Sequence, residues 1–323
     1  MSGAGDGRVA AIDCGTNSIR LLIADPDGPG LRDVHREMRI VRLGQGVDAT
    51  GEFAAEAIAR TRAALSDYAA LLGEHGVRRV RMVATSAARD VANRDEFFAM
   101  TSQVLGAVVP GAVAEVITGT EEAALSFHGA VAELDPAQGP FAVVDLGGGS
   151  TEIVVGQAGP GGGVAAGFSA DIGCVRLTER CLHSDPPTAA QVAAARGVVR
   201  RALGEALRAV PVEGVRTWVG VAGTMTTLAA LAAGLTTYDS AMIHLSRVGF
   251  GQLLKVCDDL IAMTGRQRAA LGPMHEGRAD VIAGGAIVVE ELAREFGVRA
   301  GIDTLVVSEH DILDGIALSI ARA

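Results

Sequence analysis

The sequence has little of three things: lysine, aromatic side chains and long uncharged apolar runs. Lys255 is its only lysine among 28 basic residues, and the net charge is −10. Such a chain is a poor non-specific binder of nucleic acid, although arginines gathered locally can still bind an anion. Aromatic residues make up only 3%, so we expect a core of Ala, Val, Leu and Ile, in helices packed against sheets. No apolar run reaches the ~18 residues of a membrane span.

Several targeting and catalytic motifs are also missing. Residues 1–8 lack the basic and then apolar pattern of a secretory signal peptide, which predicts a cytoplasmic protein. The four cysteines form no CxxC pair and the seven histidines show no metal-ligand spacing, so the sequence gives no zinc or thioredoxin signature. Neither the G-x-S-x-G elbow of a Ser–His–Asp hydrolase nor a Walker P-loop occurs.

What the chain does have is enough apolar sequence for two domains. Apolar residues make up 49% of 323 residues and charged residues 20%. The clearest break in composition is the Asp-, Pro- and Gly-containing stretch 135–140. We therefore predict an amino-terminal domain at 1–134 and a carboxyl-terminal domain at 135–323, with the last helix able to pack back on the first domain.

Hydrophobic periodicity predicts strands and helices in both domains. Strands are expected at 9–12, 19–24, 38–43, 80–84, 113–117, 141–144, 151–155, 218–221 and 304–307. Helices are expected at 53–72, 97–105, 121–131, 191–207, 225–233, 250–263, 279–296 and 312–321. Residues 156–163 are expected to form a glycine-rich hairpin loop.

The most informative pattern is an internal repeat. Residues 13–18 (DCGTNS) and 145–150 (DLGGGS) each join two apolar strands through an Asp, a glycine-bearing turn and a Ser. Either motif alone could be an ordinary hairpin turn. Chance does not readily repeat the whole pattern, so the pair argues for duplicated domains that face each other across a cleft.

These loops suit phosphate and a divalent cation. Turns of small residues expose backbone N–H groups, which form anion-binding nests. A third loop at 220–224 opens a helix, whose amino terminus also favours anions, although a plain strand-to-helix turn is the alternative. The predicted phosphate-binding residues are Gly15, Thr16, Asn17, Ser18, Arg89, Gly147, Gly148, Gly149, Ser150, Thr151, Gly223 and Thr224. The predicted ligands of Mg²⁺, or another divalent cation, are Asp145, Glu152 and Asp13.

In this order along the chain, the motifs resemble the exopolyphosphatase / guanosine pentaphosphate phosphohydrolase family of the actin and sugar-kinase superfamily. The resemblance is carried by residues 12–18, 84–89, 117–123, 144–152, 220–224 and 278–280. It implies an α/β fold with two ribonuclease-H-like, actin-like domains flanking a catalytic cleft. It also implies hydrolysis of the terminal phosphoanhydride of inorganic polyphosphate, with release of orthophosphate, by a homodimer.

Two adjacent carboxylates, Glu121 and Glu122, are the candidates for the catalytic base. Thr118 and Glu121 have the spacing of a capping box, which gives Glu121 a structural role and leaves Glu122 for chemistry. The resemblance agrees, because the second Glu of this pair matches the family's proposed base. We expect the helix dipole to keep Glu122 ionised.

Arginines are the candidate cations. We expect Arg89 to clamp a phosphate with its guanidinium, while Arg278 matches a family motif. The others could line a polyanion path, although a solvated face is the alternative for each: Arg20, Arg36, Arg39, Arg42, Arg78, Arg79 and Arg81.

Other functions remain open at this point. The same site could hydrolyse guanosine pentaphosphate at its 5′ end, because both substrates end in a phosphoanhydride. A small-molecule phosphotransferase or a phosphate sensor without turnover are the further alternatives. The chain ends at residue 323, without the helical extension of long family members. This favours shorter polyphosphates or a smaller substrate.

Overall fold

The computed structural model describes residues 7–28, 30–89, 91–159 and 161–321. Most of the amino-terminal stretch considered above, residues 1–8, lies outside these ranges. None of the helices in the described ranges combines the length and the apolar character that a membrane crossing needs.

The chain divides into two compact units and passes between them twice. Unit 1 contains Met1–Gly129 together with Ile312–Ala323, and unit 2 contains Ala130–Asp311. The predicted boundary between residues 134 and 135 lies a few residues beyond the first passage. The break in composition instead forms a short 3-10 helix inside unit 2, η1 (Pro136–Gln138).

Unit 1 is built on a five-stranded mixed sheet with the order β3-β2-β1-β4-β5. Its strands are β1 (Val9–Cys14), β2 (Ser18–Asp27), β3 (Gly30–Ile40), β4 (Arg79–Ala84) and β5 (Ala114–Val116). The first three strands are antiparallel neighbours, whereas β4 and β5 run parallel to β1. Every residue of β1 is buried, as expected of a central strand that is covered on both faces.

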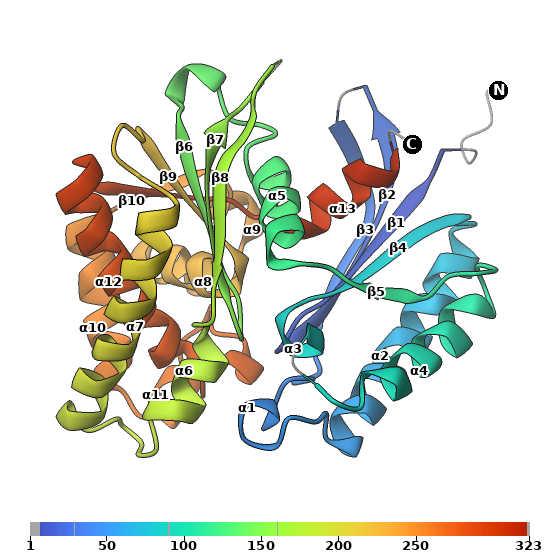
Figure 1. Ribbon diagram of the computed structural model, residues 1–323, viewed down its shortest axis with the longest axis horizontal. Coiled ribbons are helices and arrows are strands. Elements are labelled where there is room, and N and C mark those ends of the chain that lie inside the picture. The colour runs from blue at the N-terminus through green and yellow to red at the C-terminus, as the bar shows by residue number, and fades with distance from the viewer. Residues whose placement is uncertain (1–6, 29, 90, 160, 322–323) are drawn as a thin grey trace. The chain divides into compact units, whose positions relative to one another are not determined.

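Helices cover both faces of this sheet. They are α1 (Val47–Thr50), α2 (Ala55–Glu74), α3 (Ser86–Arg89), α4 (Arg94–Gly106), α5 (Gly119–Ala130) and α13 (Ile312–Ala321). Figure 1 shows α2 and α4 on one face, and α13 packs on the other against Val9 and Ala11. A Cβ at Gly315 of α13 would lie 2.0 Å from the carbonyl oxygen of Leu125 in α5, so this close approach requires glycine.

Unit 2 is built on a six-stranded sheet with the order β10-β11-β9-β6-β7-β8. Its strands are β6 (Phe141–Leu146), β7 (Thr151–Gln157), β8 (Gly163–Ala170), β9 (Thr217–Val221), β10 (Ser246–Gly249) and β11 (Thr304–Val307). Here β6, β7 and β8 are antiparallel neighbours, whereas β9 and β11 run parallel to β6.

The helices of unit 2 bury an alanine- and valine-rich core with one aromatic centre. They are α6 (Cys174–Cys181), α7 (Ala189–Ala209), α8 (Ala222–Ala232), α9 (Ser240–Ile243), α10 (Phe250–Ala262), α11 (Gly265–Ala269), η2 (Glu276–Arg278) and α12 (Ile282–Ala300). Figure 1 shows α7, α10 and α12 gathered on one side of the sheet. Trp218 of β9 stacks on Phe296 of α12 with ring centroids 4.8 Å apart.

The two sheets repeat one topology. The order β3-β2-β1-β4-β5 of unit 1 matches β8-β7-β6-β9-β11 of unit 2, to which β10 is added at the edge. Each begins with an antiparallel three-stranded meander and continues with two parallel strands. This is the ribonuclease-H-like, actin-like arrangement, so the predicted α/β fold class and duplication are confirmed.

The structure corrects several predicted elements. β3 begins at Gly30, well before the predicted strand at 38–43, and pairs along most of β2. The sequence pattern does not predict α6, β8 or β10. β8 is an edge strand in which only Ala170 is buried, so it lacks the apolar pattern that reveals a buried strand.

Candidate active site

The repeated motifs form two hairpin loops with the same backbone hydrogen bond. In unit 1, the N–H of Gly15 donates to the carbonyl of Ser18 at 2.9 Å between β1 and β2. In unit 2, the N–H of Gly147 donates to the carbonyl of Ser150 at 3.0 Å between β6 and β7. Each set of predicted phosphate-binding residues therefore lies on one tight turn at the end of a buried strand.

The carbonyl groups of the unit 2 loop are occupied by α6. The first turn of this helix donates backbone N–H groups to the carbonyls of Gly147 and Gly148 at 2.9 to 3.1 Å. Arg176 donates its Nη1 to the carbonyl of Gly149 at 2.9 Å. Within the described residues, the N–H groups of Gly148 and Gly149 find no protein acceptor. The loop therefore offers donors, not acceptors, to a ligand, as an anion requires.

The unit 1 loop is held in a similar way by the segment after β3. The N–H of Gly44 donates to the carbonyl of Thr16 at 2.8 Å, and that of Arg42 donates to Asn17 at 2.8 Å. A Cβ at Gly44 would lie 2.4 Å from Cγ2 of Thr16, so no larger residue fits there. The carbonyl oxygens of Thr16 and Asn17 are thus occupied within unit 1.

The flanking strands place a different residue opposite each repeated Asp. Asp13 of β1 faces Arg20 of β2, which donates from Nε and Nη2 to Oδ2 of Asp13 at 2.9 and 2.6 Å. Asp145 of β6 faces Glu152 of β7. Directly opposed residues in antiparallel strands have Cβ atoms ~4.5–5.5 Å apart. Unit 1 therefore pairs its Asp with a cation, whereas unit 2 places two carboxylates together.

Asp145 and Glu152 are the carboxylate pair that fits a divalent cation. Their residues are only 7% and 1% exposed, and the Ser169 hydroxyl donates to Oε1 of Glu152 at 2.6 Å. Two buried negative charges on one face repel each other, and a cation relieves that repulsion. Carboxylate oxygens are the protein ligands that Mg²⁺ prefers. The donor set of Asp145 and Glu152 therefore fits the predicted metal better than Asp13 does.

Glu122 is the buried carboxylate of unit 1. It lies in the first turn of α5 and accepts a 2.7 Å hydrogen bond on Oε2 from Nη1 of Arg89, at the end of α3. Burial raises the pKa of Glu122 to about 7, against the lowering effect of Arg89, and the charge of Asp13 adds to the rise. Burial thus outweighs the helix dipole that we expected to keep this group ionised. A carboxylate with a pKa near neutrality is well matched to general base catalysis.

Glu121 has a different environment from its neighbour. Its N–H donates to the hydroxyl of Thr118 at 3.1 Å, which is the predicted cap. Its carboxylate does not fold back on Thr118 as the capping box predicts, but accepts a 2.5 Å hydrogen bond from Arg81. The side chain is 44% exposed. Of the two candidates, Glu122 therefore has the environment of a base and Glu121 that of a surface ion pair.

The third predicted loop begins α8 with a strained backbone. Ala222 has a φ of 71°, in the left-handed region that alanine rarely adopts. A Cβ at Gly223 would lie 2.1 Å from Nη2 of Arg278, whose Nη1 donates to the hydroxyl of Thr227 at 2.7 Å. Thr224 is buried. The Arg278 guanidinium lies against this loop, and the phosphate contacts of Gly223 and Thr224 stay predictions.

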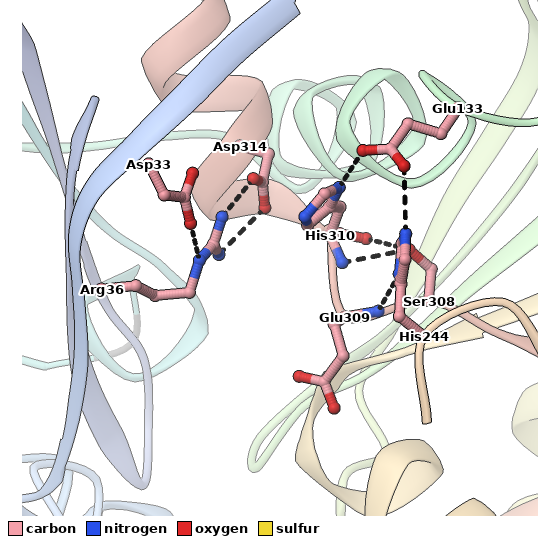
Figure 2. A network of polar contacts seen from close by, with 8 residues as sticks. All are labelled: Asp33, Arg36, Glu133, His244, Ser308, Glu309, His310 and Asp314. Carbon is pink, nitrogen blue, oxygen red and sulfur yellow. Dashed lines mark hydrogen bonds and ion pairs between the residues drawn. The ribbon is translucent and has the colours of Figure 1, made fainter. Parts of the chain in front are cut away.

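Most arginines predicted to line a polyanion path are paired within their own unit. Arg36 donates to Asp314, as Figure 2 shows. Arg39 pairs with Glu37 at 2.6 Å, and Arg81 with Glu115 at 2.5 Å. Such pairs compete with a phosphate for the same N–H groups, so these residues do not form a free cationic path.

Sequence reasoning missed several side chains that shape the loops. Ser169 and Arg176 lie on β8 and α6, which the apolar pattern does not predict. The pairing of Arg20 with Asp13 had a usable signal, because residues equally far from a hairpin turn face each other. Thr151, predicted to bind phosphate, is buried and donates its hydroxyl to the carbonyl of Ile172 at 2.6 Å.

Three comparisons place these features among known proteins. The sequence model of the Ppx/GppA phosphatase family matches residues 22–320. Exopolyphosphatase 2 of Mycobacterium tuberculosis is 72% identical over 319 residues, which cover 97% of this chain and 98% of that protein.

Two crystal structures are similar over nearly the whole chain. That of an exopolyphosphatase-like protein has a TM-score of 0.93 and 44% identity, and 98% of both chains is covered. That of the Aquifex aeolicus member of the Ppx/GppA family has a TM-score of 0.78 and 33% identity, covering 97% of this chain and 96% of the other.

Proposed function

Because the chain belongs to the Ppx/GppA phosphatase family, we propose that it is an exopolyphosphatase, which hydrolyses the terminal phosphoanhydride of inorganic polyphosphate and releases orthophosphate. The relative from M. tuberculosis bears the name of that activity at 72% identity. The observation that carries the proposal is the ion pair between the buried Glu122 and the half-buried Arg89 in unit 1. It joins a carboxylate whose pKa is about 7 to the guanidinium of Arg89, a group suited to phosphate.

In the proposed reaction, Glu122 orients a water molecule and takes up one of its protons. The water oxygen bonds to the terminal phosphorus, and the bond from that phosphorus to its bridging oxygen breaks. The electron pair of that bond stays on the shortened polyphosphate. Phosphoryl transfer of this kind depends on positioning and charge stabilisation. Arg89 holds Glu122 in place through Nη1, and its Nε and Nη2 have no partner among the described residues.

We propose that the hairpin loop of each unit binds phosphate. In unit 2 the N–H groups of Gly148 and Gly149 and the hydroxyl of Ser150 would donate to phosphate oxygens, and in unit 1 the hydroxyl of Ser18 would do so. Asp145 and Glu152 would hold Mg²⁺ or another divalent cation, which neutralises phosphate charge when bound. The fit of these residues to the metal rests on their facing positions in β6 and β7 and on their burial.

Phosphate release from polyphosphates of defined length, beside guanosine pentaphosphate and ATP, tests this function. We expect orthophosphate from polyphosphate with Mg²⁺ and almost none in chelator. Faster release from guanosine pentaphosphate would identify that nucleotide as the substrate. Transfer of labelled phosphate from ATP to an acceptor would indicate a phosphotransferase, and tight binding of every substrate without turnover would indicate a sensor.

The assembly is a separate proposal. We expect a homodimer, and light scattering coupled to size-exclusion chromatography would measure its mass. We expect no nucleic acid partner, because a protein with a net charge of −10 repels a polyanion over most of its surface. A filter-binding assay with duplex DNA at physiological salt would test this second point.

A further inference from the structure

Unit 2 contains a cluster of one carboxylate and two imidazoles outside the site described above. Glu133 follows α5, His244 directly follows α9, and His310 precedes α13. Oε1 of Glu133 lies 2.9 Å from Nδ1 of His310, and Oε2 lies 3.3 Å from Nε2 of His244 (Figure 2). The two imidazole centroids are 4.5 Å apart, with the rings tilted by 42°. Three potential metal ligands therefore converge from distant parts of the sequence.

The backbone around both histidines is fixed by hydrogen bonds. The N–H of His310 donates to the hydroxyl of Ser308 at 3.0 Å, and this buried hydroxyl donates to the carbonyl of His310 at 2.8 Å. Next to His244, the N–H of Leu245 donates to the carbonyl of Val307 in β11 at 2.7 Å. The side chains of His244 and His310 are still 21% and 30% exposed, so an ion can reach them.

We propose that Glu133, His244 and His310 bind a divalent transition-metal ion of the zinc class. Two imidazole nitrogens and one carboxylate oxygen are a donor set that zinc takes when a water or another ligand fills its fourth position. With metal–ligand bonds of ~2.0–2.1 Å, the ligands of a tetrahedral ion lie about 3.3 Å apart. The two nitrogen–oxygen contacts, 2.9 and 3.3 Å, go to different oxygens of Glu133, so this carboxylate must turn to present one oxygen to the ion. One ligand atom from each of the three residues already lies within 4.8 Å of the other two, and small side-chain movements bring them to that spacing. Mg²⁺ prefers oxygen ligands, so this site is chemically distinct from Asp145 and Glu152.

One contact of His244 must change when the ion binds. Its Nδ1 accepts a hydrogen bond from the N–H of Glu309 at 3.2 Å, so the proton of the neutral ring is on Nε2, facing Glu133. Coordination through Nε2 moves this proton to Nδ1, where it meets the N–H of Glu309. Metal binding therefore breaks the hydrogen bond from the Glu309 amide to Nδ1 of His244.

The position of the cluster gives the ion a structural consequence. Glu133 lies shortly after the first passage of the chain into unit 2, and His310 lies just before Asp311, the last residue of unit 2. An ion held by both residues fastens the entering and leaving segments of unit 2 to each other. We therefore expect zinc to stabilise unit 2 against unfolding, since it binds the folded arrangement.

Equilibrium dialysis of the full chain with zinc, in millimolar Mg²⁺ and followed by elemental analysis, tests the proposal. We expect one zinc per chain, bound about tenfold or more weakly by Glu133→Gln, His244→Gln and His310→Gln. His35→Gln is the matched control, because Nε2 of His35 also contacts a carboxylate, Glu37, at 3.1 Å, but the neighbouring imidazole of His75 lies farther away, with ring centroids 6.1 Å apart. Its zinc affinity should equal that of the wild type.

Three results would overturn the proposal: no zinc in the wild type, equal zinc in the double variant of His244 and His310, or loss of zinc in Asp145→Asn alone. Far-ultraviolet circular dichroism without metal checks that each variant folds. Hydrogen exchange supplies the second readout. Zinc should speed exchange of the Glu309 amide in the wild type but not in His244→Gln, and unchanged exchange would contradict coordination through Nε2.

Discussion

The two hairpin loops have the same turn hydrogen bond, but they differ in charge at one matched position. Arg20 stands opposite Asp13 in unit 1, whereas Glu152 stands opposite Asp145 in unit 2. The turn hydrogen bonds have nearly the same length, 2.9 and 3.0 Å. The same turn therefore occurs in both units, and one cross-strand residue decides whether the Asp faces a guanidinium or a second carboxylate.

The difference extends to the residues around each Asp. In unit 1, Asp13 and the buried Glu122 each pair with an arginine, Arg20 and Arg89. In unit 2, Glu152 receives a hydrogen bond from the neutral hydroxyl of Ser169. We infer a division of labour, in which unit 1 provides a base of controlled pKa and unit 2 provides a cation site.

The largest expected effect comes from removing the base of unit 1. Glu122→Gln should lower the rate of phosphate release about 10²–10⁴-fold, because an amide cannot take up the proton of the attacking water. Glu121→Gln is the matched control on the same helical turn, since its carboxylate is exposed and bonds to Arg81. Steady-state assays at saturating Mg²⁺ measure both. An active Glu122→Gln variant together with an inactive Glu121→Gln variant would identify Glu121 as the base.

The second effect is the pH dependence of stability that Glu122 causes. Its folded pKa of about 7 exceeds its ordinary 4.5, so between these values the folded protein binds more protons than the unfolded chain. The contribution of the protonated Glu122 to the stability of the folded state is fully present below pH 4.5 and is lost as the pH rises through 7. At pH 8, the free energy of unfolding of Glu122→Gln should therefore exceed that of the wild type by on the order of 3 kcal/mol.

Low pH provides the control for this stability measurement. Near pH 4.5, the wild-type carboxyl is protonated in the folded state, so the free energies of unfolding of wild type and Glu122→Gln should converge. Urea titrations at both pH values give these free energies. A constant difference at both would show that burial does not shift the pKa of this group.

Much of this arrangement could be predicted from the sequence, because it is local. Glycine-bearing turns between apolar strands predicted both loops, and the spacing from Thr118 separated Glu121 from Glu122. What escaped prediction depends on tertiary contacts. Ser169 lies on the exposed edge strand β8, and the pKa of Glu122 depends on burial that no local pattern encodes.

Long-range convergence is the other limit of sequence reasoning. The histidines showed no metal spacing along the chain, yet His244 and His310 meet at one carboxylate because β10 and β11 pair beside them. The same holds for the division into units. A composition break suggested a boundary near residue 135, but the chain crosses at Gly129, inside the last turn of α5.

The third effect concerns the cation site of unit 2. Glu152→Gln removes one of two facing carboxylates, so the Mg²⁺ concentration for half-maximal activity should rise about tenfold or more. Asp13→Asn changes the matched position of unit 1, and its Mg²⁺ requirement should equal that of the wild type. Activity titrated with Mg²⁺ measures both. An equal rise in both variants would show that Asp13 is also a ligand, and the comparison between the hairpins would fail.

The smallest effect tests whether Arg20 sets the pKa of the base through Asp13. In Arg20→Gln the charge of Asp13 loses its partner, and because that charge raises the pKa of Glu122, the pKa should rise further. The acid limb of the pH–rate profile should then move upward, by up to about one pH unit. Activity should fall several-fold at pH 6 and change little at pH 8.5. Arg20→Lys should restore the limb, and Asp13→Asn should move it downward. If the acid limb of the pH–rate profile of Arg20→Gln coincides with that of the wild type, Arg20 has only a structural role beside Asp13.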